Sequence, residues 1–452
     1  MQNDQSNVVL ETLSTPVEEA VDVLVLGSGS AGIGAALAAA RLGAKTLIVD
    51  PAGYPGGTLV SGLPLLGFHD GEKQVVYGIA SEMFNRLKAL GAAMGDVSRS
   101  TCVNVDPERL KLLIIEMLAE AKVSLRLHTL FARAVTSEGT ITHAVVEGKA
   151  GRRALAAKIF IDATGDGDLA ESAGAPMEKG RREDGKMQSM TLMFAVGNID
   201  TTRYEEWGGY DRMVREYIKV SESEHFRNPR RTDLSGSWGS ANRIGERAFN
   251  VTRILGYDGS DAKSLTEAEI EGRTQAWEFL ERFLKPHVPG FENAFISWTA
   301  GKIGVRETRR IVGEYVLNEN DIVSFRKFDD TVVCGSYPID IHSPTGDGTR
   351  FLPGEFYGGR YWTIPYRSLV PLNVDNLLVA GRCLSATHEA LSAVRCMANT
   401  IAMGEAAGTA AALALREGKS PRNLDVRCLQ TELIARGAWL GDFAASPVTG
   451  VR

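Results

Sequence analysis

Cysteine is scarce in this sequence, and its spacing excludes the usual paired functions. The five cysteines form no Cys-x-x-Cys pair, and their number is odd. A disulfide framework, a zinc site and a dithiol redox pair are therefore not expected, and no metal site is predicted. Cys383 and Cys396 are interpreted as small apolar packing residues.

Long apolar runs and an excess of positive charge are also missing. No stretch of about 18 apolar residues occurs, which predicts that no segment spans a membrane. The formal net charge is −6, so no nucleic-acid partner is expected. The polar N-terminus lacks the apolar core of a signal peptide, so a cytoplasmic location is expected.

Glycine, in contrast, is abundant, with 48 residues in a chain of 452 that is long enough for two domains. Such a content indicates tight turns or close approaches of the backbone to a ligand. The first concentrated run lies in VDVLVLGSGSAGIGAALAAARLGAKTLIVD, residues 21–50. We predict a buried strand at residues 22–26, a helix at 35–42 and a second strand at 46–49.

The glycines after the first strand have the spacing Gly27-x-Gly29-x-x-Gly32. The first permits a tight turn, the second lets a pyrophosphate approach the backbone, and the third lets the helix pack against the strand. Free N–H groups at the helix start then face the phosphates. Asp50 ends the second strand, where its carboxylate can accept hydrogen bonds from a ribose. This pattern predicts dinucleotide binding; the alternative is a turn used only for packing.

Later segments favour a flavin over a nicotinamide dinucleotide. Pro-Gly-Gly-Thr at residues 55–58 resembles the segment that crosses the pyrophosphate in large flavin enzymes. Ala-Thr-Gly-Asp-Gly at residues 163–167 resembles the turn beside the adenine half of FAD. The strand NLLVAGR, residues 376–382, is followed by an alanine-rich helix at 397–415, a layout in which amides at a helix start face the flavin ring. No second Gly-x-Gly-x-x-Gly motif follows a strand between residues 151 and 330, so a separate NAD(P)H domain is not expected.

With these motifs the chain resembles the bacterial FAD-dependent oxidoreductases related to the flavoproteins of fumarate reductase and succinate dehydrogenase. The resemblance covers roughly residues 20–415 and is carried by GGTLVSGLPLLGFHD, FIDATGDGDLAESAGAP, FNVTRILGYDGSD, GVRETRRIVGEY, YPIDIHSP, YWTIPYRSLVP and AGRCLSATHEALSAVRCMANTIAMGEAAG. It implies FAD as cofactor. No histidine near residues 58–62 matches the one that links FAD covalently in some relatives, so non-covalent FAD is expected.

The motifs and the resemblance together assign a set of cofactor contacts. These residues are Gly27, Gly29, Ser30, Ala31, Gly32, Asp50, Pro51, Gly56, Gly57, Thr58, Phe131, Ala132, Ala163, Thr164, Gly165, Asp166, Asp168, Gly381, Arg382, Asn399, Thr400 and Ala402.

The implied fold is α/β: a Rossmann-like FAD-binding domain of the two-dinucleotide-fold flavoprotein class, with an inserted mixed α+β cap domain for the substrate. Alternating residues at 126–165 predict strands and a hairpin. Apolar residues spaced three and four apart at 265–284 predict an amphipathic helix. The expected parts are a disordered arm at residues 1–19, the FAD domain at 20–199 and 326–430, the cap at 200–325, and a C-terminal extension at 431–452 that frays at its end.

Chemistry beside a flavin needs groups that hold the substrate and move a proton. The candidates for these catalytic functions are His388, Arg395, Arg306, His342 and His69. The resemblance supports the first two, because relatives hold a substrate carboxylate with a histidine and an arginine in an HGxNR-type segment. In this sequence the two residues are further apart than in that segment.

Three of these candidates also have a plain structural interpretation. Arg306 can anchor a carboxylate, but it can also form a salt bridge with Glu307 or Glu314. His69 and His342 can serve as histidines that only bond the backbone in turns.

The function predicted from the sequence is an FAD-dependent oxidoreductase. It would transfer a hydride between flavin N5 and a small polar, carboxylate-bearing metabolite. One alternative is a flavin-bearing subunit that passes electrons to a partner protein. Another is an RNA-modifying flavoprotein of the same fold, which the negative charge disfavours. Homodimers are common among such folds, and the sequence identifies no electron acceptor.

Overall fold

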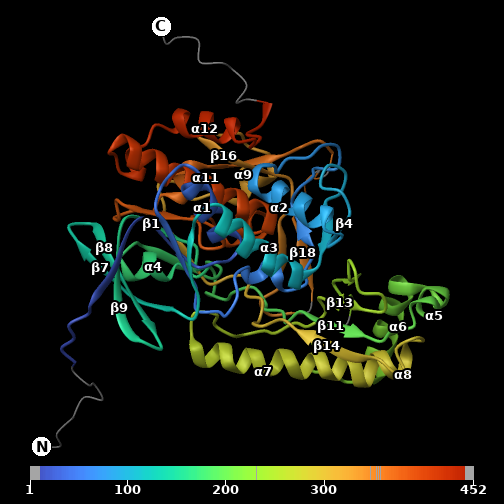
Figure 1. Ribbon diagram of the computed structural model, residues 1–452. Coiled ribbons are helices and arrows are strands. Elements are labelled where there is room, and N and C mark those ends of the chain that lie inside the picture. Colours follow the sequence, from blue (N-terminus) through green and yellow to red (C-terminus); the bar gives the residue numbers. More distant parts are fainter. Residues whose placement is uncertain are drawn as a thin grey trace, which may run out of the picture.

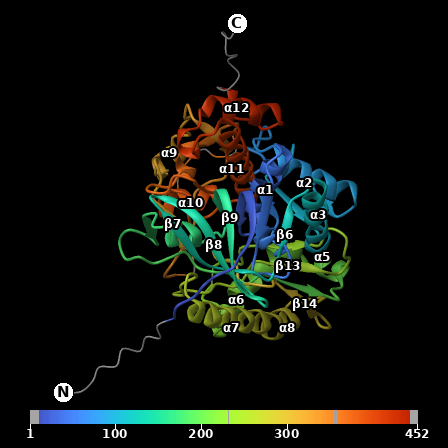
Figure 2. The same cartoon turned by 60° about the vertical axis from the view of Figure 1, so that its left-hand side comes forward.

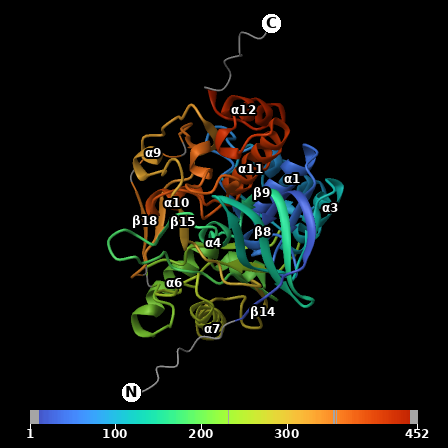
Figure 3. The ribbon, with the colours of Figure 1, turned by 90° about the vertical axis from the view of Figure 1, so that its left-hand side faces the viewer.

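The computed structural model of the protein describes residues 11–442 except 231, 347, 353, 355 and 357. A seven-stranded sheet with the order β6-β2-β1-β9-β8-β7 forms its centre, and β20 also pairs with β9. In all three ribbon views, α12 lies at one end of the molecule and α7 at the other (Figure 1, Figure 2, Figure 3).

Five strands of this sheet run parallel and carry the predicted dinucleotide motif. They are β1 (Val17–Leu26), β2 (Thr46–Val49), β6 (Ser124–Arg126), β9 (Gly151–Asp162) and β20 (Leu377–Val379). β7 (Leu130–Ser137) and β8 (Thr140–Gly148) extend the sheet as the predicted antiparallel hairpin. The apolar runs of β1 and β2 are buried, as expected for parallel strands covered on both faces. The predicted strands are therefore confirmed.

Two long helices pack side by side on the sheet. They are α1 (Ser30–Arg41) and α11 (Met397–Glu417). Glycine allows the close contact: a Cβ atom at Gly404 would lie 1.9 Å from the carbonyl oxygen of Ala31. A Cβ atom at Gly408 would lie 2.1 Å from the carbonyl oxygen of Ala35. α1 begins five residues before the predicted start at residue 35 and so includes Gly32 and Gly34. Gly34 packs closely against Ile401 of α11, and Gly32 packs against Gly27.

Further elements surround this centre. The helices are α2 (Gly78–Ala89), α3 (Pro107–Glu120), α4 (Asp168–Ser172), α9 (Glu319–Val323), α10 (His388–Val394) and α12 (Val426–Ala435). The short strands are β3 (Leu65–Leu66), β4 (Ala93–Met94), β5 (Cys102–Val105), β10 (Met177–Lys179), β15 (Arg309–Ile311), β16 (Thr331–Gly335), β17 (Asp340–His342), β18 (Thr349–Phe351) and β19 (Trp362–Pro365). No helix of the described residues is both long and apolar enough to cross a bilayer.

A second, antiparallel sheet forms a separate layer with the strand order β12-β13-β11-β14. Its strands are β12 (Ser237–Gly239), β13 (Arg247–Phe249), β11 (Phe194–Gly197) and β14 (Phe295–Thr299). Phenylalanines on one of its faces pack against α5 (Thr201–Trp207), α6 (Gly209–Ser223) and α7 (Ala262–Glu278). Figure 1 shows α7 running along the outer edge of this layer.

The predicted amphipathic helix at residues 265–284 is confirmed as α7, which continues into a π-helical turn at Phe279–Leu284 and α8 (Lys285–His287). Two predicted boundaries differ from the observed elements. β1 already begins at Val17, inside the arm expected at residues 1–19, and the second sheet already includes β11 before residue 200. Residues 1–10 of the arm and the expected frayed C-terminus lie outside the described residues. The domain boundaries themselves stay a prediction.

Candidate active site

A cavity of about 1000 Å³ lies between the two layers. Its wall includes Gly29 and Asp50 from the central sheet and Thr191, Trp238 and Ala300 from the second layer. The volume is at the upper end of the usual range for ligand pockets, about 300–1,000 Å³. One cavity can thus hold a large cofactor together with a small substrate.

The glycine-rich turn forms one end of this cavity. Gly27 has φ +97°, and a Cβ atom there would lie 2.4 Å from the carbonyl oxygen of Ala163. At Gly29 a Cβ atom would meet nothing within 4 Å. Gly29 is the N-cap of α1 and supplies no side-chain cap, so the first amides of the helix are free to bind an anion. This geometry fits a pyrophosphate at the start of α1.

Asp50 is held in place at the same end of the cavity. Its Oδ2 accepts hydrogen bonds from the amide of Ser28 at 2.6 Å and from the Ser28 hydroxyl at 2.8 Å. Its Oδ1 accepts from the amide of Ala52 at 2.8 Å. The residue is 6% exposed and lines the cavity. Among the described residues, Oδ1 accepts only this one bond and has capacity for another, so the residue fits the predicted contact with a ribose.

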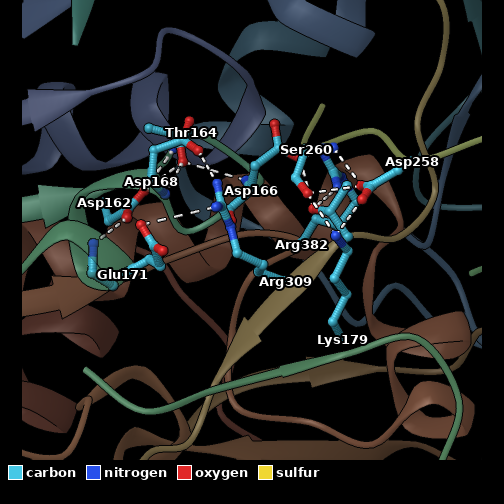
Figure 4. Close-up of polar contacts among 12 residues, drawn as sticks. Asp162, Thr164, Asp166, Asp168, Glu171, Lys179, Asp258, Ser260, Arg309 and Arg382 are labelled. Carbon is cyan, nitrogen blue, oxygen red and sulfur yellow. Dashed lines mark hydrogen bonds and ion pairs between the residues drawn. The ribbon is translucent and has the colours of Figure 1, made fainter. Parts of the chain in front are cut away.

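The Ala-Thr-Gly-Asp-Gly turn is fixed by a network of charged groups (Figure 4). Asp166 Oδ1 accepts from Arg382 Nη2 at 2.8 Å and from the Thr308 hydroxyl at 2.6 Å. Arg309 pairs with Asp168, which lies outside the cavity wall. Burial raises the pKa of Asp168 to about 6, and the neighbouring carboxylates of Asp162 and Asp166 add to this rise.

A second helix start faces the same cavity. α11 begins after Cys396, which gives no side-chain cap, and Cys396, Met397 and Thr400 line the wall. The Thr400 hydroxyl donates to the Ser30 hydroxyl at 2.7 Å, which joins the two helix starts. Two uncapped N-termini therefore point at one space, and both favour electron-rich groups.

Four arginines line the cavity, and two of them, Arg306 and Arg395, are buried without an ion pair to any carboxylate of the described residues. Arg306 Nη1 donates to the carbonyl oxygen of Ser189 at 2.7 Å and to the Thr191 hydroxyl at 2.8 Å. Arg395 Nη2 donates to the Asp340 carbonyl oxygen at 3.1 Å and to Gln188 Oε1 at 3.4 Å, and its buried Nε has no hydrogen-bond partner. Both guanidinium groups lie deep in the protein with part of their surface facing the cavity.

The electrostatic field of this region is positive. Burial lowers the pKa of Arg306, and the charges of Arg395 and Arg253 lower it further. Burial also lowers the pKa of His342, with a further contribution from Arg306. Although its own burial acts to raise it, the pKa of Asp340 is held well below its usual range by the His342 contact and by the guanidinium groups.

Both nitrogens of His342 face protein groups. Nε2 lies 3.4 Å from Asp340 Oδ1, and Nδ1 lies 3.4 Å from Arg253 Nη2. A neutral ring with its proton on Nε2 satisfies both contacts.

His388 and His69 do not reach the cavity wall. His388 lies behind it, with Nδ1 2.7 Å from Glu307 Oε2, and Glu307 also pairs with Arg310. Gln188 connects this buried group to the cavity. Its backbone N–H donates to Glu307, while its side-chain Oε1 accepts from Arg395. His69 Nδ1 accepts from the amide of Gly71 at 3.0 Å, as in its alternative interpretation as a turn histidine.

The structure brings most, but not all, of the predicted residues to the cavity. Those that line it are Gly27, Gly29, Ser30, Ala31, Asp50, Gly57, Thr58, Ala163, Thr164, Gly165, Asp166, Arg306, His342, Gly381, Arg382, Arg395 and Thr400. Those that do not are Gly32, Pro51, Gly56, His69, Phe131, Ala132, Asp168, His388, Asn399 and Ala402. Their contacts with cofactor and substrate stay predictions.

Sequence reasoning missed several residues that shape the site. Asp340 and Tyr337 both line the cavity and bond to each other at 3.0 Å. They belong to the quoted segment YPIDIHSP, in which only His342 was a candidate. Gln188 and Trp238 lie in segments without any recognisable motif. Among the described residues, no cluster of side chains is suited to hold a metal ion.

The fold and the cavity define a dinucleotide-binding protein of the Rossmann-like flavoprotein class. The sequence model of the family described as FAD dependent oxidoreductase matches residues 22–433. The chain belongs to this family, and it is an enzyme that uses FAD. A relationship to fumarate reductase in particular is not part of this match.

Solved structures with a similar fold are distant. A geranylgeranyl bacteriochlorophyll reductase-like protein from Thermoplasma acidophilum is 15% identical, with a TM-score of 0.47 over 93% of this chain and 84% of its own. The p-nitrophenol 4-monooxygenase PnpA from Pseudomonas putida DLL-E4 is 11% identical, with a TM-score of 0.44 over 95% of this chain and 91% of its own. No protein of curated function matches the chain significantly.

Proposed function

We propose that this FAD-dependent oxidoreductase exchanges a hydride with a small metabolite whose carboxylate binds between Arg306 and Arg395. The observation that carries the proposal is that both guanidinium groups face the cavity with only neutral hydrogen-bond acceptors. A charge removed from water without a counter-ion is costly. The ionised Asp340 carboxylate nearby forms no hydrogen bond with either guanidinium group and supplies one negative charge for two positive ones. A substrate carboxylate would provide the second negative charge and can bind arginine in a bidentate way.

Other residues would bind the cofactor and position the residues that hold the substrate. When bound, FAD supplies a hydride acceptor or donor. The free amides at the start of α1 and the Asp50 carboxylate would hold its pyrophosphate and ribose. His342 is assigned a positioning function, because both of its nitrogens already face Asp340 and Arg253. His388 supports Arg395 indirectly, through Glu307 and Gln188. We retain a cytoplasmic location as part of this proposal.

Anaerobic titration of the purified yellow protein with a panel of carboxylates tests the proposal. A substrate should bleach the visible flavin absorbance in the absence of oxygen, and the Arg395→Lys variant should need a much higher concentration of it. Bleaching by neutral compounds alone, or equal titration curves for the variant, would refute the carboxylate assignment. If no compound bleaches the flavin until a second protein is added, the alternative of an electron-transfer subunit replaces it.

A further inference from the structure

One wall of the cavity is apolar, and most of it belongs to the second layer. The face of the four-stranded sheet opposite its phenylalanine core carries a separate apolar cluster. Four members of this cluster line the cavity, and we call them the apolar wall: Leu63, Met193, Trp238 and Ala300. Trp238 is the largest of them, and its indole offers a flat surface for another ring.

The apolar wall lies directly beside the cationic end of the cavity. Thr191 and Met193 are two residues apart in an extended segment that leads into β11. Side chains two apart in an extended chain share a face and lie about 7 Å from each other. Both line the cavity, and the Thr191 hydroxyl accepts from Arg306. A ligand held by Arg306 therefore has Met193 as its neighbour.

The same wall is unsuited to a second charge. Its members provide no hydrogen-bond donor except the indole N–H of Trp238, so a carboxylate placed against them would lose water without compensation. The buried cationic groups of the cavity, Arg306 and Arg395, are both at the end already assigned to the first carboxylate. Arg215 and Lys302 also line the cavity, but both are exposed to solvent. A small dicarboxylate whose second carboxylate lies against the apolar wall would thus leave that charge against apolar carbon.

We infer that the substrate is a monocarboxylate with a bulky apolar body, of which an aryl acid is the simplest example. Its carboxylate binds Arg306 and Arg395, and its body lies against Met193 and Trp238, which set the specificity. This inference rests on the proposed function and deepens it, because it names which carboxylates the site accepts.

Calorimetric titration of the FAD-loaded protein tests the inference without relying on turnover. The probes are phenylacetate, acetate, succinate and the neutral phenylacetamide. Phenylacetate should bind at least about tenfold more tightly than acetate or succinate, since burial of a ring contributes well over 1.4 kcal/mol. In Trp238→Ala this preference should fall several-fold, with acetate binding unchanged. Trp207→Ala, which changes a tryptophan outside the cavity, should behave as wild type.

The outcomes separate this inference from the proposed function. If acetate and succinate bind as tightly as phenylacetate, the inference is wrong while the carboxylate site stands. If Trp238→Ala loses FAD but keeps the preference, the wall contacts the cofactor and the inference is also wrong. If phenylacetamide binds as tightly as phenylacetate, the carboxylate site itself is wrong. Met193→Ala replaces Trp238→Ala if the latter does not fold, with the same expected loss of preference.

Discussion

At the scale of single residues, Arg306 differs from the paired arginines that surround it. Arg309 and Arg310 each have a carboxylate partner, whereas Arg306 donates only to neutral oxygens. The side chain is therefore available to an anion. Loss of a charge-assisted hydrogen bond costs about 1.5–3 kcal/mol.

Replacement of Arg306 should consequently impair substrate use rather than folding. Arg306→Met is expected to lower kcat/KM about 10- to 100-fold, since each 1.4 kcal/mol corresponds to a factor of ten. Arg203→Met is the matched control, because Arg203 is exposed and pairs with Glu292 at the surface. Steady-state kinetics measure both variants. A wild-type kcat/KM in Arg306→Met would show that this guanidinium does not hold the substrate.

Glu405 offers a second prediction at the residue scale. It lies buried in α11 and accepts from the amide of Ile79, near the start of α2, at 3.0 Å. Burial raises its pKa to about 7. The folded protein therefore binds a proton more tightly than the unfolded chain between about pH 4.5 and pH 7. This residue alone should lower the free energy of unfolding as the pH rises through that window.

The Glu405→Gln variant should remove that dependence. The side-chain amide of glutamine still has an oxygen that accepts from Ile79, but it carries no charge. The difference in the free energy of unfolding between variant and wild type should therefore be up to about 3 kcal/mol more favourable to the variant at pH 8 than at pH 4.5. Urea unfolding at the two pH values measures the difference. Glu417→Gln, near the exposed end of the same helix, is the control. Parallel pH profiles for wild type and Glu405→Gln would contradict the prediction.

At the scale of elements, the contact between α1 and α11 determines the geometry of both helix starts. Gly404 stands where a Cβ atom would overlap the carbonyl oxygen of Ala31. Gly404→Ala must push the helices apart, and overpacking of this kind costs roughly 1–3 kcal/mol. The variant should lose stability and also bind FAD more weakly, because the amides of α1 move away from those of α11.

A matched substitution controls for the loss of glycine itself. Gly239→Ala introduces a Cβ atom that meets nothing within 4 Å, so its stability and FAD affinity should stay close to wild type. Thermal unfolding and FAD fluorescence titration compare the two variants. If Gly404→Ala binds FAD normally, the helix contact does not position the cofactor.

The same elements explain which parts of the site could be predicted from the sequence. The dinucleotide end could be predicted because Gly27, Gly29 and Asp50 belong to one strand–helix–strand unit, in which spacing in the sequence determines position in space. At the substrate end the sequence named Arg306 and Arg395 as separate candidates, but it could not predict that they lie at one end of the same cavity, because they come together only after the whole chain has folded. The position of His388 behind the cavity wall could not be predicted for a related reason: it begins the short α10 and lies against buried Glu307.

At the scale of the whole molecule, the cavity lies between two layers that a bound cofactor would join. Binding to the folded state stabilises it by about 2.7 kcal/mol when the free ligand is at 100 times its Kd. FAD should therefore raise the Tm of the apoprotein in a concentration-dependent way, and Asp50→Asn should require more FAD for the same shift. Differential scanning calorimetry measures the Tm of both proteins at each FAD concentration. If the Tm of the apoprotein does not change at saturating FAD, the protein does not bind FAD at this site.

A crystal structure of the protein reconstituted with FAD would show where the cofactor binds. We expect the pyrophosphate to lie against the free amides at the start of α1, Asp50 to contact a ribose hydroxyl, and the flavin ring to point toward Arg306 and Arg395. A cofactor bound outside this cavity, or an Asp50 side chain turned away from the ribose, would contradict this expectation.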